Sequence, residues 1–358
     1  MPPAAPSSGL DEDYVASADF QASLLLPCAQ TLGINRRLLW GLARARITGP
    51  WPFWYALDMS KLIGLIAFTT VFSFGQDPAA TWAAQSGSKY AIRPNVVYGT
   101  WSGYEAKLDV YQRRDATTPQ PTLIFIHGGG WVLGTKESAV MSFLPWLEMG
   151  WNVVNVEYRL SHVALAPAAV EDCLCALKFV VAHAKDYNVD TARIVTSGES
   201  AGGHLALTTG MIPESAGLDL QCPGINFQGR GADVPKVAAI VNWYGITDLN
   251  DMLGGPNERA YAVEWFAGLP NREELARKLS PLTYVRKGLP PIMSIQGDAD
   301  PIVPYSNSTR LRDALTTAGV PNELVTIPGG GHGNFKAEER VRAFNSIRAF
   351  LDKNHVSQ

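Results

Sequence analysis

The stretch RIVTSGESAGGHLAL, residues 193–207, joins two different sequence patterns around one serine. Before Ser200 stands a β-branched run, Ile194 to Thr196, which is typical of a buried strand. After it comes an alanine- and leucine-rich run, which is typical of a helix. The G-x-S-x-G pattern between them fits an ordinary turn, because glycine and serine gather in turns. It also fits a sharp strand-to-helix turn that exposes the serine hydroxyl, so the context decides.

The composition limits the class of protein. The chain has 358 residues, of which 46% are hydrophobic and 18% charged, enough for one large domain with a sizeable core and an extension. The net charge is −3 and no lysine or arginine block stands out, so we expect no nucleic-acid partner. The four cysteines include no C-x-x-C motif, which argues against a zinc site or a redox pair. Cys173 and Cys175 lie two apart in a helical pattern and are not expected to pair with each other.

The first 75 residues are expected to form an extension before the main domain at 76–358. Within it, residues 59–75 combine a start-like Met59, one lysine, an apolar run of 13 residues and small residues after it. This pattern is typical of a secretory signal peptide and too short for a stable membrane span. If Met59 is the natural start, the protein is expected to be secreted or periplasmic. Otherwise it is expected to be cytoplasmic, with 20–75 forming a helical cap on the main domain.

The remainder of the chain alternates between strand-like and helix-like patterns. Alternating segments at 95–99 and 106–112 predict antiparallel strands. Apolar runs predict buried strands at 122–126, 152–158, 193–196, 237–243, 291–295 and 324–327. Helices are expected near 138–148, 167–185, 201–211, 306–318 and 337–354. Because such strands bury both faces, the sequence predicts an α/β fold: a mostly parallel sheet covered by helices on both faces.

Two segments, 212–236 and 246–289, lack this alternation. The first is polar and glycine-rich, and the second is helical and aromatic. Both follow elements at the edge where the carboxyl ends of the strands lie, which is where parallel sheets bind ligands. We therefore expect them to be lid or cap insertions that shape a pocket.

In this context Ser200 is interpreted as a nucleophile on a sharp turn. A serine hydroxyl needs a base. Among the six histidines, His332 in PGGGHGNF directly follows the last predicted strand, so it is expected to reach the same end of the sheet. The stretch IQGDADPIVP supplies two candidates for the acid that orients this histidine, Asp298 and Asp300. Asp298 is also suited to holding the turn itself.

A further glycine-rich stretch, His127-Gly-Gly-Gly-Trp131, follows the predicted strand at 122–126. Its glycines allow the backbone to approach a ligand closely and to turn N–H groups toward it. Together with the N–H of Ala201, these groups are expected to form an oxyanion hole. Trp131 adjoins this hole and is expected to line the pocket, and Glu199 is assigned to substrate binding.

From residue 95 to 353 the chain resembles α/β-hydrolase serine esterases of the hormone-sensitive-lipase-like and BD-FAE-like group. The stretch HGGGW is followed in the family's order by Gly198-Glu-Ser-Ala-Gly202, Gly297-Asp-Ala-Asp-Pro301 and Gly331-His332-Gly333. The resemblance implies an α/β-hydrolase catalytic domain at 76–358, and it favours Asp300 over Asp298. The implied catalytic triad is Ser200, Asp300 and His332. The implied oxyanion donors are Gly129, Gly130 and Ala201, with Gly128 in some relatives.

The expected activity is hydrolysis of a carboxylic ester through an acyl-enzyme. The expected partner is a small-molecule ester with a short acyl chain or a carbohydrate alcohol, and neither a metal nor an organic cofactor is expected. One alternative is a formamidase-type amide hydrolase, because relatives of kynurenine formamidase share HGG-x-W. Another is a non-catalytic ligand receptor of the same fold, which the presence of His332 disfavours.

Overall fold

The computed structural model describes residues 78–223 and 235–357. The predicted extension at 1–75, with its signal-like part at 59–75, lies outside them. The signal-peptide and cap interpretations therefore both stay predictions. Among the helices that are described, none is long and apolar enough to cross a membrane.

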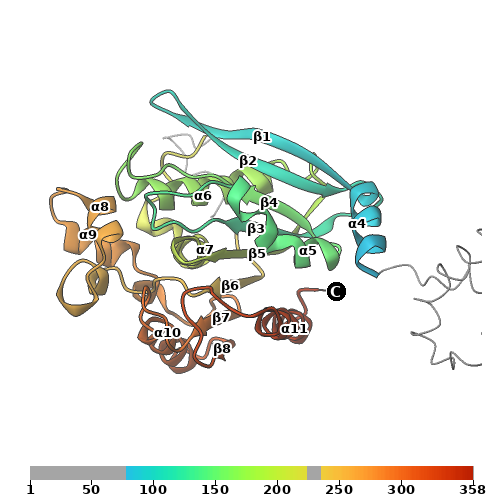
Figure 1. Ribbon diagram of the computed structural model, residues 1–358. Helices are drawn as coiled ribbons and strands as arrows, with labels where there is room; N and C mark the ends of the chain where they lie inside the picture. The colour runs from blue at the N-terminus through green and yellow to red at the C-terminus, as the bar shows by residue number, and fades with distance from the viewer. Residues whose placement is uncertain (1–77, 224–234, 358) are drawn as a thin grey trace, which may run out of the picture. The chain divides into compact units, whose positions relative to one another are not determined.

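The described strands form one eight-stranded sheet in the order β1-β2-β4-β3-β5-β6-β7-β8 (Figure 1). Strand β1 pairs antiparallel with β2, and β2 pairs antiparallel with β4. All later pairs are parallel, which confirms the predicted fold class. The strands are β1 (Tyr90–Trp101), β2 (Tyr104–Arg113), β3 (Gln120–Ile126), β4 (Asn152–Val156), β5 (Val189–Glu199), β6 (Ala239–Trp243), β7 (Ile292–Gly297) and β8 (Asn322–Ile327).

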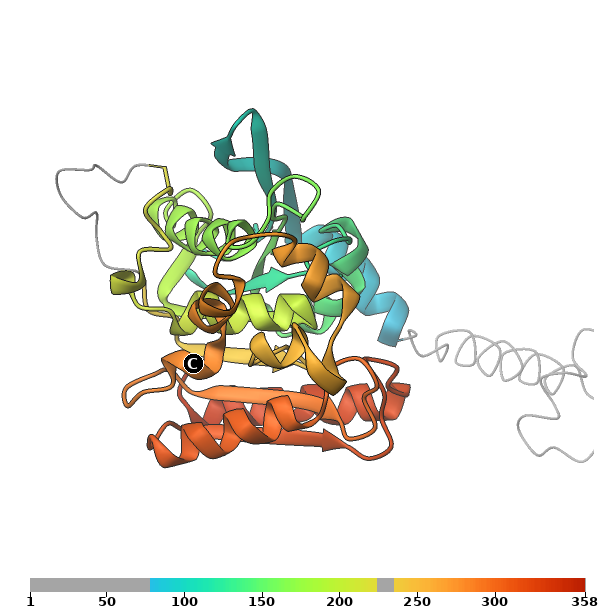
Figure 2. The same cartoon turned by 90° about the vertical axis from the view of Figure 1, so that its left-hand side faces the viewer.

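Helices lie on both sides of this sheet. Figure 1 shows α6, α7 and α10 on one side and α5 and α11 on the other. Figure 2 looks onto the first of these sides, with α8 and α9 in orange in front of it. The α-helices are α4 (Pro78–Lys89), α5 (Leu144–Glu148), α6 (Ala168–Ala182), α7 (Ala201–Met211), α8 (Ala260–Phe266), α9 (Arg272–Leu279), α10 (Ser306–Thr317) and α11 (Ala337–Lys353).

The end of the central strand β3, residues 123–126, is apolar at every position because both of its faces are buried. Successive side chains of a strand point to opposite faces of the sheet. Leu123 and Phe125 join the apolar cluster that contains Phe350 of α11. Ile124 and Ile126 join the cluster that contains the apolar residues of α6 and α7. Both faces are buried, so the run has no polar alternation.

Several boundaries differ from those expected, among them those of one helix and one strand. The helix expected at 138–148 is a 3-10 helix, η1 (Glu137–Phe143), followed by α5. Pro145 stands in the first turn of α5, where its missing N–H is tolerated, and it prevents one α-helix from running through. The strand expected at 193–196 is longer, because β5 reaches Glu199 and delivers Ser200 directly to the edge of the sheet.

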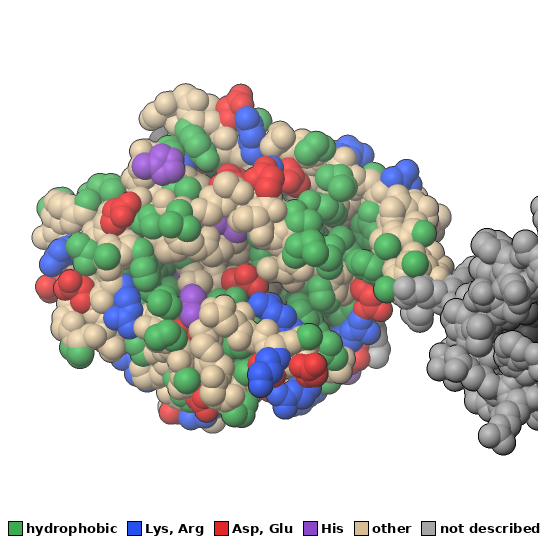
Figure 3. Space-filling view, viewed as in Figure 1, with side chains coloured by type: hydrophobic (Ala, Val, Ile, Leu, Met, Phe, Trp, Pro, Cys, Tyr) green, Lys and Arg blue, Asp and Glu red, His purple; other side chains and the backbone are tan. Residues whose placement is uncertain are grey.

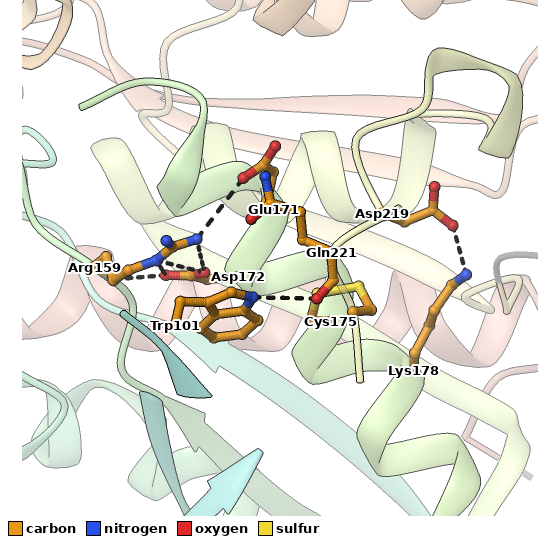
Figure 4. The surroundings of a disulfide bond; sticks show 9 residues. Trp101, Arg159, Glu171, Asp172, Cys175, Lys178, Asp219 and Gln221 are labelled. Atoms are coloured by element: carbon orange, nitrogen blue, oxygen red, sulfur yellow. Dashed lines mark hydrogen bonds and ion pairs between the residues drawn. A yellow bond between two sulfur atoms is a disulfide. The ribbon is translucent and has the colours of Figure 1, made fainter. Parts of the chain in front are cut away.

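A disulfide that the sequence did not predict joins Cys175 of α6 to Cys222 (Figure 4). Their Cα atoms lie 5.0 Å apart, although the residues are 47 positions apart in the chain. Cys173 is a buried free thiol, in agreement with the expectation that it does not pair with Cys175. The disulfide therefore fastens the end of the segment 212–223 to α6.

Two further contacts hold the same segment (Figure 4). Lys178 of α6 forms an ion pair with Asp219, and the indole Nε1–H of Trp101 donates to the backbone oxygen of Gln221 at 3.1 Å. Residues 212–223 consequently lie against α6 and the end of β1. None of them lines the cavity that contains Ser200, so the expectation that this segment shapes the pocket is not met by these residues.

Candidate active site

The residues singled out in the sequence gather at the carboxyl edge of the parallel strands. Residues 128–130 follow β3, Ser200 follows β5, Asp300 follows β7 and His332 follows β8. The glycines, Ser200 and His332 line one cavity of about 350 Å³. This is the edge at which parallel α/β sheets place their ligand sites. On the face of the molecule drawn in Figure 3, acidic and basic side chains are intermixed with apolar ones.

Ser200 stands on a strained turn between β5 and α7. Its φ of 57° and ψ of −119° are rarely adopted by a residue with a side chain. Gly202 permits the close crossing of α7 over β3, because a Cβ there would lie 2.1 Å from the backbone oxygen of Ile126. The N–H of Ser200 donates to the oxygen of Trp243 at 2.9 Å, which ties the turn to β6. The turn therefore has the geometry expected of a nucleophile elbow.

Ser200, His332 and Asp300 form one hydrogen-bonded chain. The Nε2 atom of His332 lies 2.8 Å from Oγ of Ser200, and its Nδ1 atom lies 2.8 Å from Oδ2 of Asp300. The other oxygen of Asp300 accepts the backbone N–H groups of Ile302 at 2.8 Å and Val303 at 3.0 Å. Serine, base and acid are thus held in the order required for proton transfer from the serine.

The two candidate aspartates have different surroundings. Burial alone would raise the pKa of Asp300, but the hydrogen bond and charge of His332, with the backbone N–H groups, lower it below its usual range. Asp300 therefore stays ionised opposite the histidine. Asp298 accepts the N–H of Gly329 at 2.6 Å and so holds the turn.

The glycine loop presents unpaired donors beside Ser200. Gly129 has a φ of 117°, and a Cβ there would lie 1.8 Å from the backbone oxygen of Leu133. Within the described residues, the N–H groups of Gly129 and Gly130 donate to no acceptor. The N–H of Ala201 stands at the first position of α7, where a helix has no acceptor of its own. These groups are suited to receive a developing negative charge.

The structure corrects the expectation that Trp131 lines the pocket. Its side chain is fully buried and stacks on Trp265 of α8, with ring centroids 4.3 Å apart. It also meets His204 of α7 edge-on at 5.1 Å. The backbone of Trp131 has a φ of 61°, which is unusual for a large residue. With this backbone conformation the side chain points into the core. Trp131 thus anchors the end of the glycine loop in the core and does not contact the cavity.

Glu199 does line the cavity, next to Ser200. Burial raises the pKa of its carboxyl group. The hydroxyls of Ser142 and Tyr244 and the charge of Arg340 act to lower this pKa. The place of Glu199 in the cavity wall is compatible with the assignment to substrate binding, which stays a prediction.

The remaining cavity wall was only partly predicted. Tyr261 of α8 lines the cavity, which meets the expectation that the segment 246–289 shapes the pocket. Its ring packs on Gly130, where a Cβ would lie 2.8 Å from the ring. No local sequence signal identifies this contact, because the two residues are distant in the chain. The other wall residues are Val132, Leu133, Tyr244 and Ile302.

Among the described residues, no group of three or more His, Cys, Asp or Glu side chains is arranged to hold a metal ion. The fold and the serine–histidine–aspartate arrangement instead define the α/β-hydrolase class. The BD-FAE family model matches residues 108–315. This is more than half of the chain, and the chain belongs to that family.

The curated relatives are esterases. Esterase LipC of Mycobacterium tuberculosis (strain ATCC 25618 / H37Rv) is 28% identical over 284 residues, which cover 75% of this chain and 67% of LipC. Isoprenylcysteine α-carbonyl methylesterase of Arabidopsis thaliana is 25% identical over 259 residues, which cover 70% of this chain and 58% of that protein. The chain thus spans between one half and two thirds of the length of these curated relatives.

Solved structures agree with this classification. A thermophilic esterase, Est2, from Thermogutta terrifontis superposes with a TM-score of 0.61 at 25% identity, covering 74% of this chain and 92% of that one. A truncated carbohydrate esterase from gut microbiota gives 0.61 at 27% identity, covering 75% of this chain and 98% of that one. The family, the relatives and the fold make this protein an esterase.

Proposed function

We propose that the protein is a serine carboxylic-ester hydrolase in which Ser200 is the nucleophile, His332 the base and Asp300 the orienting acid. The observation that carries this proposal is the hydrogen-bonded chain of these three groups, with 2.8 Å on each side of the imidazole. A ligand receptor of the same fold that performs no catalysis would not need these hydrogen bonds between the serine, the histidine and the aspartate.

The chemistry follows from the geometry. His332 takes the proton of Ser200 as the hydroxyl oxygen attacks the acyl carbon. Asp300 accepts the Nδ1–H of the imidazole and stabilises its positive charge. The N–H groups of Gly129, Gly130 and Ala201 would hold the negative oxygen of the tetrahedral intermediate. His332 then protonates the leaving alcohol, and a water activated by the same histidine releases the acyl group.

The proposed substrates are esters with a short acyl chain or a carbohydrate alcohol. The cavity of about 350 Å³ has apolar walls from Val132, Leu133 and Ile302, and this size and lining suit a small apolar acyl group. Two relatives support the proposal: the Est2 esterase has been solved with propionate bound, and another similar structure is a carbohydrate esterase.

We also propose that the protein works outside the cytoplasm, secreted or periplasmic. The disulfide between Cys175 and Cys222 supports this location, because structural disulfides persist in oxidising compartments. The signal-like pattern at 59–75 points the same way. N-terminal sequencing of the protein isolated from its native host tests the proposal, and a retained segment 2–58 on a cytoplasmic protein would contradict it.

The activity is tested with p-nitrophenyl esters from acetyl to decanoyl, on the wild type and on Ser200→Ala. We expect the acetyl to butyryl esters to be the best substrates and Ser200→Ala to lose a factor on the order of 10⁴ or more in kcat. Ser346→Ala is the matched control, because that hydroxyl donates only to Arg342 of its own helix. A wild type that cleaves formyl-anilides but no ester would instead favour the amidase alternative.

The same wild-type enzyme is then given an acetylated xylo-oligosaccharide, with released acetate as the readout. A higher kcat/KM on this ester than on p-nitrophenyl acetate would support a carbohydrate alcohol. Release of no acetate, with rapid cleavage of p-nitrophenyl acetate, would contradict that part of the proposal and leave the short acyl preference intact.

A further inference from the structure

A second cavity lies at the edge of the sheet opposite to Ser200. It has a volume of about 220 Å³ and is lined by residues of α4, of the start of β1, of the end of β2 and of the end of α5. The end of β2 pairs with the start of β4, so the cavity borders the amino edge of the parallel strands. Figure 1 shows α4 at this end of the sheet and α8 and α9 at the other. No step of the proposed hydrolysis uses this cavity, which we call the α4 cavity.

Helix α4 turns a mostly polar stripe toward the α4 cavity. The lining residues of the helix are spaced at i, i+3, i+4 and i+7 and therefore share one face: Trp82, Gln85, Ser86 and Lys89. A surface helix normally turns an apolar stripe of this spacing toward its domain. Among the residues that the structure describes, none is a hydrogen-bond, ion-pair or ring partner of these four side chains. The stripe is therefore better suited to a polar ligand than to packing.

A guanidinium of fixed orientation stands on the opposite wall. The Nε and Nη2 atoms of Arg113 donate to the carboxylate of Asp115 at 2.9 Å and 2.8 Å. Its Nη1 atom lies 3.0 Å from where a Cβ on Gly150 would stand, and both Arg113 and Gly150 line the cavity. Nη1 has no acceptor within the described part of the chain. Asp115 thus holds the guanidinium in place and leaves Nη1 available to a ligand.

Tyr90 keeps the two walls together without a ligand. This buried residue begins β1 directly after α4, and it lines the cavity. Its hydroxyl lies 2.9 Å from the backbone oxygen of Leu147 and 3.0 Å from that of Trp151. The end of α4 is therefore fastened to the segment that forms the opposite wall, and the cavity is largely preformed.

The charges around the α4 cavity favour an anion. Its charged lining residues are Lys89, Arg113 and Glu148. Glu148 forms an ion pair with Arg348 of α11, and Arg113 forms one with Asp115. Lys89 has no ion-pair partner among the described residues. Three basic side chains thus stand against two acidic ones, and the excess charge is positive.

We propose that the α4 cavity binds a sugar ring that carries a carboxylate, such as one uronic acid unit of a polysaccharide. The ammonium of Lys89 and Nη1 of Arg113 bind the carboxylate. The side chains of Gln85 and Ser86 bind ring hydroxyls. The indole of Trp82 contacts the C–H groups of the ring, because an aromatic face carries partial negative charge.

The aromatic residue distinguishes this ligand from a simple anion. Inorganic phosphate would contact Lys89 and Arg113 and would leave Trp82 without a partner. The inference goes beyond the proposed function and does not depend on it, because this cavity and Ser200 border opposite edges of the sheet. A sugar unit bound here leaves the catalytic cavity free, so the protein could stay attached to a polysaccharide while it cleaves an ester elsewhere on the chain.

The test is isothermal titration calorimetry with methyl galacturonoside and methyl galactoside, which differ in one carboxylate. We expect the wild type to bind the acid up to about fivefold more tightly than the neutral sugar, as is usual for an exposed charge pair. Lys89→Met should remove this difference and leave the affinity for the neutral sugar unchanged. Trp82→Ala should weaken the binding of both sugars about tenfold, and Trp82→Phe should restore part of it.

Lys287→Met is the matched control, because Lys287 is exposed and outside the cavity lining. Hydrolysis of p-nitrophenyl acetate should be the same in the wild type, Lys89→Met and Trp82→Ala, with or without the sugar acid. Inhibition of hydrolysis by the sugar acid would place it in the catalytic cavity and overturn the inference.

Three further results would overturn the inference: no binding of the sugar acid to the wild type, equal binding to the wild type and Trp82→Ala, or inorganic phosphate that binds as tightly as the sugar acid and displaces it. If Trp82→Ala fails to fold, Lys89→Met and Trp82→Phe decide the question. A wild type that binds the sugar acid through Trp82 and Lys89 but cleaves no ester would support this inference and refute the proposed function.

Discussion

Breaking the disulfide between Cys175 and Cys222 is expected to lower the melting temperature of the domain by about 10 °C. The bond closes a loop of 47 residues that contains Ser200 and all of α7. The loop-entropy relation for that length corresponds to about 4 kcal/mol at 25 °C. For a domain of this size each kcal/mol shifts the melting temperature by roughly 2–4 °C. The bonded Cys175 and Cys222 are both buried, so little local relaxation is available to offset the loss.

The assay is thermal unfolding followed by tryptophan fluorescence, with and without reductant, on the wild type and on Cys222→Ser. Cys173→Ala is the control, because it removes a buried thiol and leaves the disulfide in place. Reductant should lower the melting temperature of the wild type and of Cys173→Ala by the same amount, and that of Cys222→Ser hardly at all. The reasoning is refuted if thiol titration shows two additional free thiols in the wild type after reduction while the melting temperature stays the same.

Two other perturbations have definite expected outcomes. Asp300→Asn should lower kcat on p-nitrophenyl acetate by a factor on the order of 10³–10⁴, because asparagine cannot hold the histidine in the right tautomer; an enzyme that melts normally and keeps more than a tenth of its kcat would contradict this role. Burial lowers the pKa of His204 to about 4. Between that pH and about 6.5 the unfolded chain therefore binds one more proton than the folded protein. The free energy of unfolding consequently falls as the pH falls through this range, by up to roughly 3 kcal/mol. His204→Gln should therefore lose less stability than the wild type between pH 7 and pH 4.5 in urea unfolding, and an equal loss in both proteins would show that His204 does not titrate in this way.

The strands and the serine turn could be predicted from the sequence because both depend on local patterns. The run Leu123 to Ile126 is apolar at every position, as is typical of a strand that is buried on both faces. The glycines around Ser200 are needed wherever a helix crosses so close to a strand, as the 2.1 Å approach at Gly202 shows. Such constraints act between neighbours in the chain, so one sequence is enough to reveal them.

The hydrogen-bonded site could be anticipated for a different reason. Parallel strands bring all their carboxyl ends to one edge, so a polar residue directly after a strand is placed in space by topology alone. His332 and Ser200 are 132 positions apart in sequence and 2.8 Å apart in space for this reason. The choice between Asp298 and Asp300 did not follow from topology, because both leave the same strand. The turn geometry separates them, with one carboxylate on Gly329 and the other on His332.

Side-chain direction outside regular elements was not predictable, and Trp131 and Tyr261 show why. Trp131 follows the glycine loop directly, yet it stacks on Trp265 in the core. Tyr261 comes from an insertion far along the chain and occupies the cavity wall. Trp131 leaves its expected place because its backbone has a positive φ, and Tyr261 reaches the cavity wall because α8 packs over the glycine loop. The pairing of Cys175 with Cys222 depends in the same way on where an insertion after a helix comes to rest. The cavity wall therefore depends on contacts between insertions, while the positions of the serine, the histidine and the aspartate depend on the sheet.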